Sequence, residues 1–246
     1  MFNKLVDGLR RAANDSGFSK AVLGLSGGVD SSVAAAIACK ALQAENVILF
    51  YLPYNDTDPH GFTDAKTVAD FLGSSLVYMD ITRMADPYFD SLILPTERRR
   101  VNVLSRLRML VLYDQSALYN ALVIGAANKS EIMLGSVTLF GDGAYAINPL
   151  GNIYKTELIE LARQIGLPDS VLSKAESPVY KIVSDNGEES TAAYTEIDKI
   201  LTVLETVGYS IDAALEQGLQ RGLVEKIAKL IKNSEFKRRA GIIIDR

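Results

Sequence analysis

The chain has 246 residues but only one cysteine and one histidine. One cysteine excludes an internal disulfide framework and fits a reducing compartment, so we expect a cytoplasmic protein. With one residue of each type, a zinc site built from clustered cysteine and histidine ligands is excluded as well. His60 follows an Asp58-Pro59 pair that is typical of a helix start, which predicts a solvated side chain instead of a catalytic one.

Long apolar runs and an excess of basic residues are also missing. No apolar run approaches the ~20 residues needed to cross a bilayer, so no membrane partner is expected. The first 17 residues have the spacing of an amphipathic helix and not the pattern of a signal peptide. The net charge of −4 argues against a nucleic-acid partner. The length predicts a single domain over residues 1–246.

A turn rich in glycine and serine stands between an apolar run and an alanine-rich run. Ala21–Leu25 predicts a strand, Val33–Ala41 predicts a helix, and residues 26–31 between them read Ser-Gly-Gly-Val-Asp-Ser. Glycine lets the backbone approach a phosphate, and the first N–H groups of a helix have no partner within it. Asp30 would repel phosphate, so we expect it to hold a divalent cation that phosphate oxygens share.

Two widespread phosphate-binding fingerprints are absent from this turn. No Gly-Lys-Ser/Thr follows the glycines, as it would in a Walker A loop, and the Gly-x-Gly-x-x-Gly pattern is missing. Ser-Gly-Gly-x-Asp-Ser instead resembles the signature of the ATP pyrophosphatases, which cleave ATP between its α- and β-phosphates. The alternative is a glycine-rich turn that binds nothing; the strand, three hydroxyls and a carboxylate favour the phosphate site.

Strand and helix signals alternate along the first two thirds of the chain. This alternation predicts an α/β fold with a doubly wound parallel sheet and helices on both faces. We expect further strands at residues 46–53, 75–80 and 121–125, and helices at 60–72, 155–165, 195–207, 211–219 and 223–232. The part after Pro149 is therefore mostly helical. Residues 180–190 are polar and weakly patterned, which predicts a loop.

Residues 97–120 form a long helical region that is more apolar than one helix face requires. Burial in the core and contact with a second subunit both explain this excess, and we favour the subunit contact. Arg106 and Arg108 then lie on different faces of the helix. One of them would reach an anionic ligand while the other forms a surface ion pair.

A second polar cluster follows the strand expected at 121–125. Its sequence is Asn-Lys-Ser-Glu at residues 128–131, and it lies on the same rim of the sheet as the glycine turn. Glu131 is a candidate to complete a magnesium site with Asp30, or else an acidic residue that favours a helix start. Lys155 begins a helix, where a lysine is unfavourable to the dipole. A phosphate partner would explain its position, and a plain surface lysine is the alternative.

Taken in order, these segments resemble the ammonia-dependent NAD synthetases over nearly the whole chain. The resemblance is carried by GLSGGVDSS at residues 24–32, Leu52-Pro53, Asn102 with Arg106 and Arg108, VIGAANKSE at 123–131, TLFGDGAYAINPLGNIYKTEL at 138–158, and EFKR at 235–238.

This resemblance implies a Rossmann-like, homodimeric ligase that uses Mg²⁺ and ATP. Such an enzyme adenylates the nicotinate carboxylate of deamido-NAD, releases pyrophosphate, and lets ammonia displace AMP. It implies catalytic roles for Asp30 and Lys155, and magnesium ligands at Asp30 and Glu131. The implied ATP contacts are Gly24, Leu25, Ser26, Gly27, Gly28, Val29, Asp30, Ser31, Ala126, Lys155 and Ser177. The implied dinucleotide contacts are Asn102, Arg106 and Lys237.

The chain departs from the family pattern mainly on the acceptor side. Ala126 replaces a threonine, Ser136-Val137 replaces an aromatic pair, and Leu139 and Ala146 stand where many members carry lysine and aspartate. The segment at residues 176–186 is also altered. A ligase that amidates another carboxylate, such as a sugar acid, is therefore one alternative, and a non-catalytic nucleotide-binding protein is another. No glutaminase domain is evident, so we expect free ammonia or a separate partner to supply nitrogen.

Overall fold

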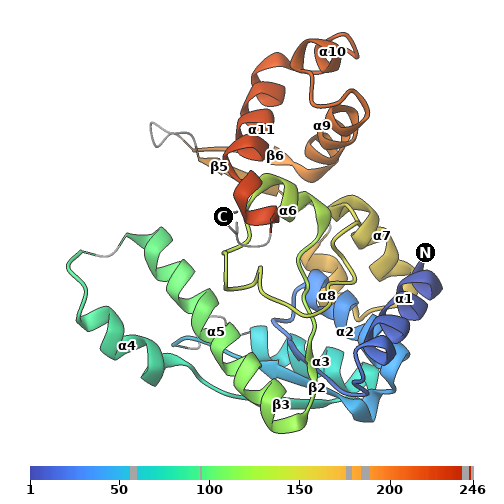
Figure 1. The fold of residues 1–246 in the computed structure, drawn as a ribbon, viewed down its shortest axis with the longest axis vertical. Helices are drawn as coiled ribbons and strands as arrows, with labels where there is room; N and C mark the ends of the chain where they lie inside the picture. The colour runs from blue at the N-terminus through green and yellow to red at the C-terminus, as the bar shows by residue number, and fades with distance from the viewer. Residues whose placement is uncertain (56–59, 95, 176–178, 184–188, 240–243, 245–246) are drawn as a thin grey trace.

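The computed structural model describes residues 1–55, 60–94, 96–175, 179–183, 189–239 and 244. A four-stranded sheet lies at the base of the molecule (Figure 1). Its strands are β1 (Ala21–Gly24), β2 (Val47–Tyr51), β3 (Ser75–Tyr78) and β4 (Leu122–Val123). All pairs are parallel, in the order β3-β2-β1-β4. The predicted α/β fold with a parallel sheet is confirmed.

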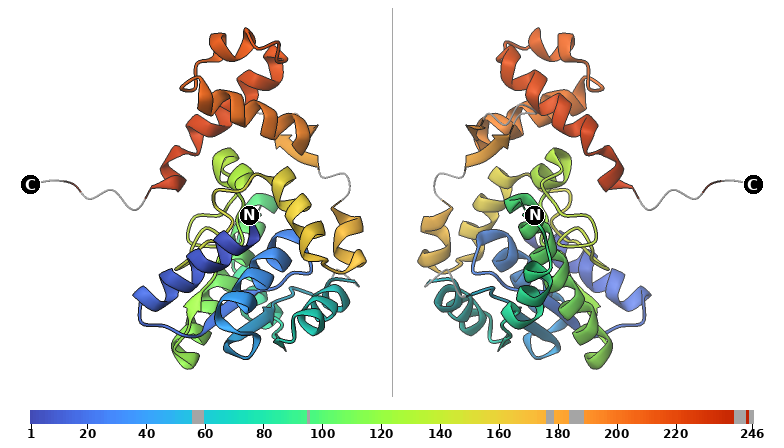
Figure 2. Two further views of the ribbon diagram at one scale, coloured as in Figure 1. Left: turned by 90° about the vertical axis from the view of Figure 1, so that its right-hand side faces the viewer. Right: turned by 90° about the vertical axis from the view of Figure 1, so that its left-hand side faces the viewer.

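Helices cover both faces of this sheet (Figure 2). On one face, α2 (Val29–Leu42) and α3 (Gly61–Leu72) pack against the strands. The helices α1 (Phe2–Asp15), α7 (Lys155–Ile165) and α8 (Asp169–Lys174) pack on α2 and share the same apolar cluster. The other face packs against α5 (Glu97–Tyr119), with α4 (Thr82–Asp90) beside it. Because side chains alternate along a strand, Leu23 packs in the first cluster and Val22 in the second.

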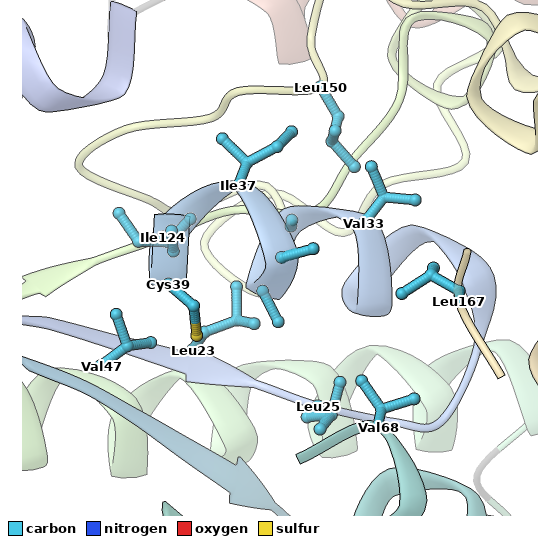
Figure 3. Close-up of a cluster of buried hydrophobic side chains, with 14 of the residues drawn as sticks. Leu23, Leu25, Val33, Ile37, Cys39, Val47, Val68, Ile124, Leu150 and Leu167 are labelled. Carbon is cyan, nitrogen blue, oxygen red and sulfur yellow. The ribbon is translucent and has the colours of Figure 1, made fainter. Parts of the chain in front are cut away.

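The helix α2 is buried on nearly all sides, which explains its composition. Six of its residues, 32–35, 37 and 38, have no exposed surface, and all of them except Ile37 are serine, alanine or valine. Small side chains let the helix lie close to β1 while α1 and α7 pack on its outer side. Figure 3 shows Val33 and Ile37 of α2 among Leu23, Ile124 and Leu150 from the surrounding segments. The core therefore fixes α2, and with it the turn that precedes α2.

The residues after 178 form a separate unit above the sheet domain, here called the C-terminal unit (residues 179–183 and 189–238). It contains β5 (Val179–Val183), β6 (Glu189–Ala193), α9 (Tyr194–Thr206), α10 (Ile211–Leu215), α11 (Arg221–Asn233) and the short helix η2 (Glu235–Arg238). Its own apolar cluster also takes in Met133 and Leu134 of α6 (Lys129–Leu134). The unit therefore rests on α6, as Figure 1 shows.

The loop predicted at residues 180–190 is wrong where the structure describes it. β5 and β6 pair antiparallel, with Tyr180 opposite Ala192 and Ile182 opposite Ser190. Among the hairpin residues whose burial is described, Ile182 and Ala192 alone are buried, whereas Lys181 and Thr191 are exposed. With so few buried apolar residues in each strand, the alternation of apolar and polar side chains is too weak to be recognised in the sequence. Residues 184–188 lie outside the described part of the chain.

None of the helices in the described ranges is both long enough and apolar enough to span a bilayer.

Candidate active site

The glycine turn occupies the end of β1, where its backbone geometry requires glycine. Gly27 has a φ of +82°, and a Cβ atom there would lie 3.0 Å from Asp64 Cβ and from the carbonyl oxygen of Gly61. The N–H of Leu25 donates to the carbonyl of Phe50 at 2.8 Å, which ties the turn to β2. The turn is thus held between β2 and α3.

The serine side chains give the turn its shape. Ser31 Oγ accepts a hydrogen bond from the N–H of Ser26 at 3.2 Å and lies 3.0 Å from Ser26 Oγ. Ser26 Oγ in turn accepts from the N–H of Gly28 at 3.3 Å. Gly28 is the N-cap of α2 and has no side chain to cap it, so the first N–H groups of α2 remain for a ligand. This end of the helix also carries the positive end of its dipole, which favours an anion.

Asp30, in the first turn of α2, links three distant parts of the chain. Its Oδ1 accepts a hydrogen bond from Asn128 Nδ2 at 2.7 Å, and its Oδ2 is ion-paired with Lys155 Nζ. The side chain of Lys155 is only 10% exposed, so its ammonium group has little contact with solvent and interacts mainly with Asp30. The structure therefore brings the two predicted catalytic residues into direct contact.

Asn128 positions Glu131 at the start of α6. Asn128 Oδ1 accepts from the N–H of Glu131 at 3.0 Å, and Glu131 Oε2 accepts from the N–H of Asn128 at 3.1 Å. This reciprocal pair is a capping box. Asn128 is fully buried, and its remaining donor is the one that contacts Asp30. One asparagine thus fixes both predicted magnesium ligands.

The electrostatics of Glu131 fit a site that takes up a cation. Burial, followed by the nearby charge of Asp30, raises the pKa of Glu131 to about 7, while the charge of Lys155 opposes this shift. In the described ranges no group of three or more His, Cys, Asp or Glu side chains is placed to hold a metal. Two carboxylates suit Mg²⁺ bound together with phosphate and water, because Mg²⁺ usually keeps several such ligands.

A cavity of about 620 Å³ opens beside this cluster, beyond the carboxyl ends of the strands. The predicted residues that line it are Gly24, Leu25, Ser26, Asp30, Ser31, Ala126 and Glu131. Its opposite wall is formed by residues 50–53, which include the end of β2, and by α5 residues such as Arg108, Met109 and Leu112. Seven of the predicted ATP and metal residues therefore share one cavity. Ser177 lies outside the described residues.

The three predicted dinucleotide contacts are placed differently, since none of them lines the cavity. Arg106 Nε donates to the carbonyl of Leu139 at 3.1 Å, and Asn102 Oδ1 accepts from Thr138 Oγ1 at 2.8 Å. Lys237 Nζ donates to the carbonyls of Gly135 and Val137 at 2.7 and 2.9 Å. All three side chains hold the segment at residues 135–139, here called the acceptor segment, which contributes Ser136 and Thr138 to the cavity wall.

Two further residues at the site have no assigned role in the sequence-based prediction. Arg108 lines the cavity, and its Nε donates to the carbonyl of Leu52 at 2.8 Å; burial lowers the pKa of Arg108. Tyr194 is buried at the start of α9, and burial with the charges of Glu131 and Asp30 raises the pKa of Tyr194. Lys155 Nζ lies 5.9 Å from the centre of the Tyr194 ring. The sequence predicts that either Arg106 or Arg108 reaches an anionic ligand, so Arg108 is one of two candidates. No pattern in the sequence predicts that Tyr194 lies near Lys155.

Comparison with known proteins decides the family. A family model described as NAD synthase matches residues 1–241. The chain belongs to the NAD synthase family. The NH₃-dependent NAD⁺ synthetase of Fusobacterium nucleatum is 38% identical over 241 residues, which is 98% of this chain and 93% of that protein.

Solved structures of NAD synthase relatives have the same fold. The NH₃-dependent NAD synthetase of Campylobacter jejuni, solved with a nitrate ion, superposes with a TM-score of 0.85 at 32% identity, covering 99% of this chain and 97% of that one. The NMN synthetase of Francisella tularensis superposes with a TM-score of 0.80 at 27% identity, covering 100% and 97%. Two solved proteins that are named for different synthetase activities therefore share the fold of this chain.

Proposed function

We propose that this chain converts deamido-NAD to NAD with ATP and ammonia, using the cavity between the glycine turn, α5 and α6. Membership of the NAD synthase family makes it a carbon–nitrogen ligase, and relatives named NH₃-dependent NAD synthetases support this reaction. The observation that carries the assignment of residues is the contact of Asp30 with both Lys155 and Asn128, next to Glu131.

The residues divide the chemistry between binding and charge stabilisation. The glycine turn presents N–H groups and the positive end of the α2 dipole to the ATP phosphates. Lys155 adds a cation where negative charge collects as the acceptor carboxylate attacks the α-phosphate and pyrophosphate leaves. Adenylation turns a poor electrophile into an acyl group with AMP as the leaving group, and ammonia then displaces AMP. Bound by Asp30 and Glu131, Mg²⁺ supplies neutralisation of phosphate charge.

The direct test is product analysis of purified protein. Incubation with deamido-NAD, ATP, Mg²⁺ and ammonia gives NAD, AMP and pyrophosphate in equal amounts, measured by chromatography and a pyrophosphate assay. Formation of ADP, or the absence of product at high enzyme concentration, contradicts the proposal.

A second acceptor has a specific observation in its favour. The solved protein from Francisella tularensis is named an NMN synthetase, and three of the departures expected from the sequence, Ser136, Val137 and Leu139, lie in the acceptor segment. The mononucleotide counterpart of deamido-NAD is therefore the alternative substrate. ATP–pyrophosphate exchange distinguishes deamido-NAD from its mononucleotide counterpart when it is measured with each carboxylate in turn, including sugar acids. Only the true acceptor stimulates exchange.

We also propose that the protein is a homodimer and is located in the cytoplasm. Four large side chains of α5, Val101, Leu110, Tyr113 and Leu118, are exposed, which supports contact with a second copy. The single cysteine, Cys39, is buried in α2 and fits a reducing compartment. Sedimentation of the parent gives a dimer, whereas Leu110→Lys sediments as a monomer. An unchanged mass for Leu110→Lys places the interface elsewhere.

A further inference from the structure

A buried carboxylate of the C-terminal unit reaches the base of the active site. Asp198, on α9, is 5% exposed. Its Oδ1 accepts a hydrogen bond from Ser130 Oγ at 2.5 Å, and its Oδ2 accepts from the N–H of Thr156 at 2.9 Å. One side chain of α9 thus contacts the first turns of both α6 and α7.

The same contacts lead directly to Lys155. Ser130 Oγ, besides donating to Asp198, accepts from the backbone N–H of Lys155 at 3.0 Å. The N-cap of α7 is Tyr154, whose side chain makes no capping hydrogen bond. The N–H groups of the first two residues of α7 are instead satisfied by Ser130 and Asp198. The start of α7 is therefore fixed by α6 and α9.

The helix starts that Asp198 joins are those that carry the catalytic side chains. Lys155 is the first residue of α7, and Glu131 is the third residue of α6. We propose that Asp198 is a positioning residue that sets Lys155 against Asp30 by holding these two helix starts together. This inference rests on the proposed function. It gives the C-terminal unit a part in catalysis in addition to its contact with α6.

Only a carboxylate accepts both hydrogen bonds and also carries a negative charge. Each oxygen of Asp198 accepts one hydrogen bond, and its negative charge lies at two helix N-termini, where it is favourable. The side-chain amide introduced by Asp198→Asn has one acceptor oxygen, so either the Ser130 hydroxyl or the Thr156 N–H loses its acceptor. The loss of one accepting oxygen and of the negative charge weakens the hold of α9 on the start of α7.

The chain offers a matched control on the same helix. Glu205, also on α9, accepts from Lys129 Nζ at 2.6 Å and from the Tyr154 hydroxyl at 2.5 Å, and its side chain is 34% exposed. It thus joins α9 to the residues that immediately precede Ser130 and Lys155. Glu205→Gln makes the same carboxylate-to-amide change in a contact that does not include the backbone of Lys155.

The experiment compares Asp198→Asn, Glu205→Gln and the parent as full-length proteins. Asp198→Asn lowers kcat for pyrophosphate release by about 10- to 100-fold, as expected for a residue that orients another catalytic group. Glu205→Gln stays within about twofold of the parent because exposed ion pairs contribute little. The second readout is the acylation rate of lysines by acetic anhydride, followed by mass spectrometry. Lys155 reacts faster in Asp198→Asn, while the exposed Lys232 reacts at the parent rate.

A variant on the other side of the contact keeps the test decisive if Asp198→Asn does not fold. Ser130→Ala removes the acceptor of the Lys155 N–H, so it also lowers kcat and speeds the acylation of Lys155. In the variant that carries both substitutions, the two losses of kcat are not additive. Unchanged kcat and unchanged Lys155 acylation in folded Asp198→Asn overturn the inference. Equal acceleration at Lys155 and Lys232 also overturns it, because that result reports general destabilisation. A parent without pyrophosphate release contradicts the proposed function, while the acylation comparison still tests Asp198.

Discussion

The ATP side and the acceptor side of the cavity are built in different ways. On the ATP side, the turn is continuous with β1 and the buried helix α2, and Asp30 is held by Asn128 and Lys155. On the acceptor side, the segment at residues 135–139 is held by hydrogen bonds from the side chains of Asn102, Arg106 and Lys237. A change on the proposed ATP side disturbs the core around α2, whereas a change on the proposed acceptor side disturbs a few side-chain hydrogen bonds to one segment.

Most of the departures expected from the family resemblance fall on the proposed acceptor side. They are Ser136, Val137, Leu139 and Ala146, whereas the glycine turn keeps the family motif and Ala126 is the one departure beside the proposed ATP site. If the proposed roles hold, a scaffold that fixes the glycine turn through its core and the acceptor segment through a few side-chain hydrogen bonds can change acceptors without refolding. The predictions below test this contrast, beginning with the largest effect.

The largest effect is expected for Asp30. Asp30→Ala removes a magnesium ligand and leaves the ammonium group of Lys155 buried without its partner. We expect pyrophosphate release to fall by at least about 1000-fold, at the upper end of losses for a single electrostatic group. The measurement is kcat at saturating Mg²⁺. A rate within a few-fold of the parent would falsify the assignment of Asp30.

A backbone test of the ATP side uses Gly27. Gly27→Ala forces a side chain into a positive φ and against Asp64 Cβ, so we expect a loss of about 2–3 kcal/mol in unfolding free energy together with weaker ATP binding. Gly166→Ala is the matched control, because Gly166 has a φ of +76° but open space around its Cβ position. Urea unfolding and ATP titration give both quantities. Equal losses of stability in the two variants mean that the contact with Asp64 contributes nothing.

The metal-free protein is expected to lose stability as pH rises through the Glu131 transition. The pKa of Glu131 is about 7 in the folded chain and 4.5 as its ordinary value, so folding favours the protonated form. The contribution of Glu131 to the free energy of unfolding is fully present below pH 4.5 and is lost as pH rises through about 7. The loss is at most about 3 kcal/mol. Thermal unfolding in EDTA across this range measures the loss. Glu131→Gln should flatten the profile, and an equally steep profile in that variant assigns the loss to another group.

The smallest effect is expected on the acceptor side. Arg106→Ala removes the hydrogen bond to Leu139, so we expect KM for the acceptor to rise about tenfold while KM for ATP stays unchanged. Arg221→Ala, which removes a surface pair with Glu225, is the control. Equal changes in both KM values for Arg106→Ala would show that the two sides of the cavity are not independent.

The sequence predicts one part of the site well, for a physical reason. Parallel strands present their carboxyl ends at one edge, so the Asp30 and Glu131 segments had to meet once the strands before them were recognised. The contacts of Tyr194 and Asp198 could not be predicted in this way, because they depend on how the C-terminal unit packs on α6 and α7; Asp198 lies 68 residues from Ser130 along the chain. The hydrogen bond from Asn128 to Asp30 depends instead on the orientation of one amide side chain at that edge of the sheet, which the sequence does not give. The hairpin that begins this unit was missed because so few of its side chains are buried.

The junction of β6 with α9 has a mechanical consequence. β6 ends at Ala193 and α9 begins at Tyr194, with no residue between them. Only the backbone dihedral angles at this junction can absorb a change in the direction of the strand, so a shift of the hairpin is readily passed on to the first turn of α9. The hairpin is thereby coupled to the helix that carries Asp198.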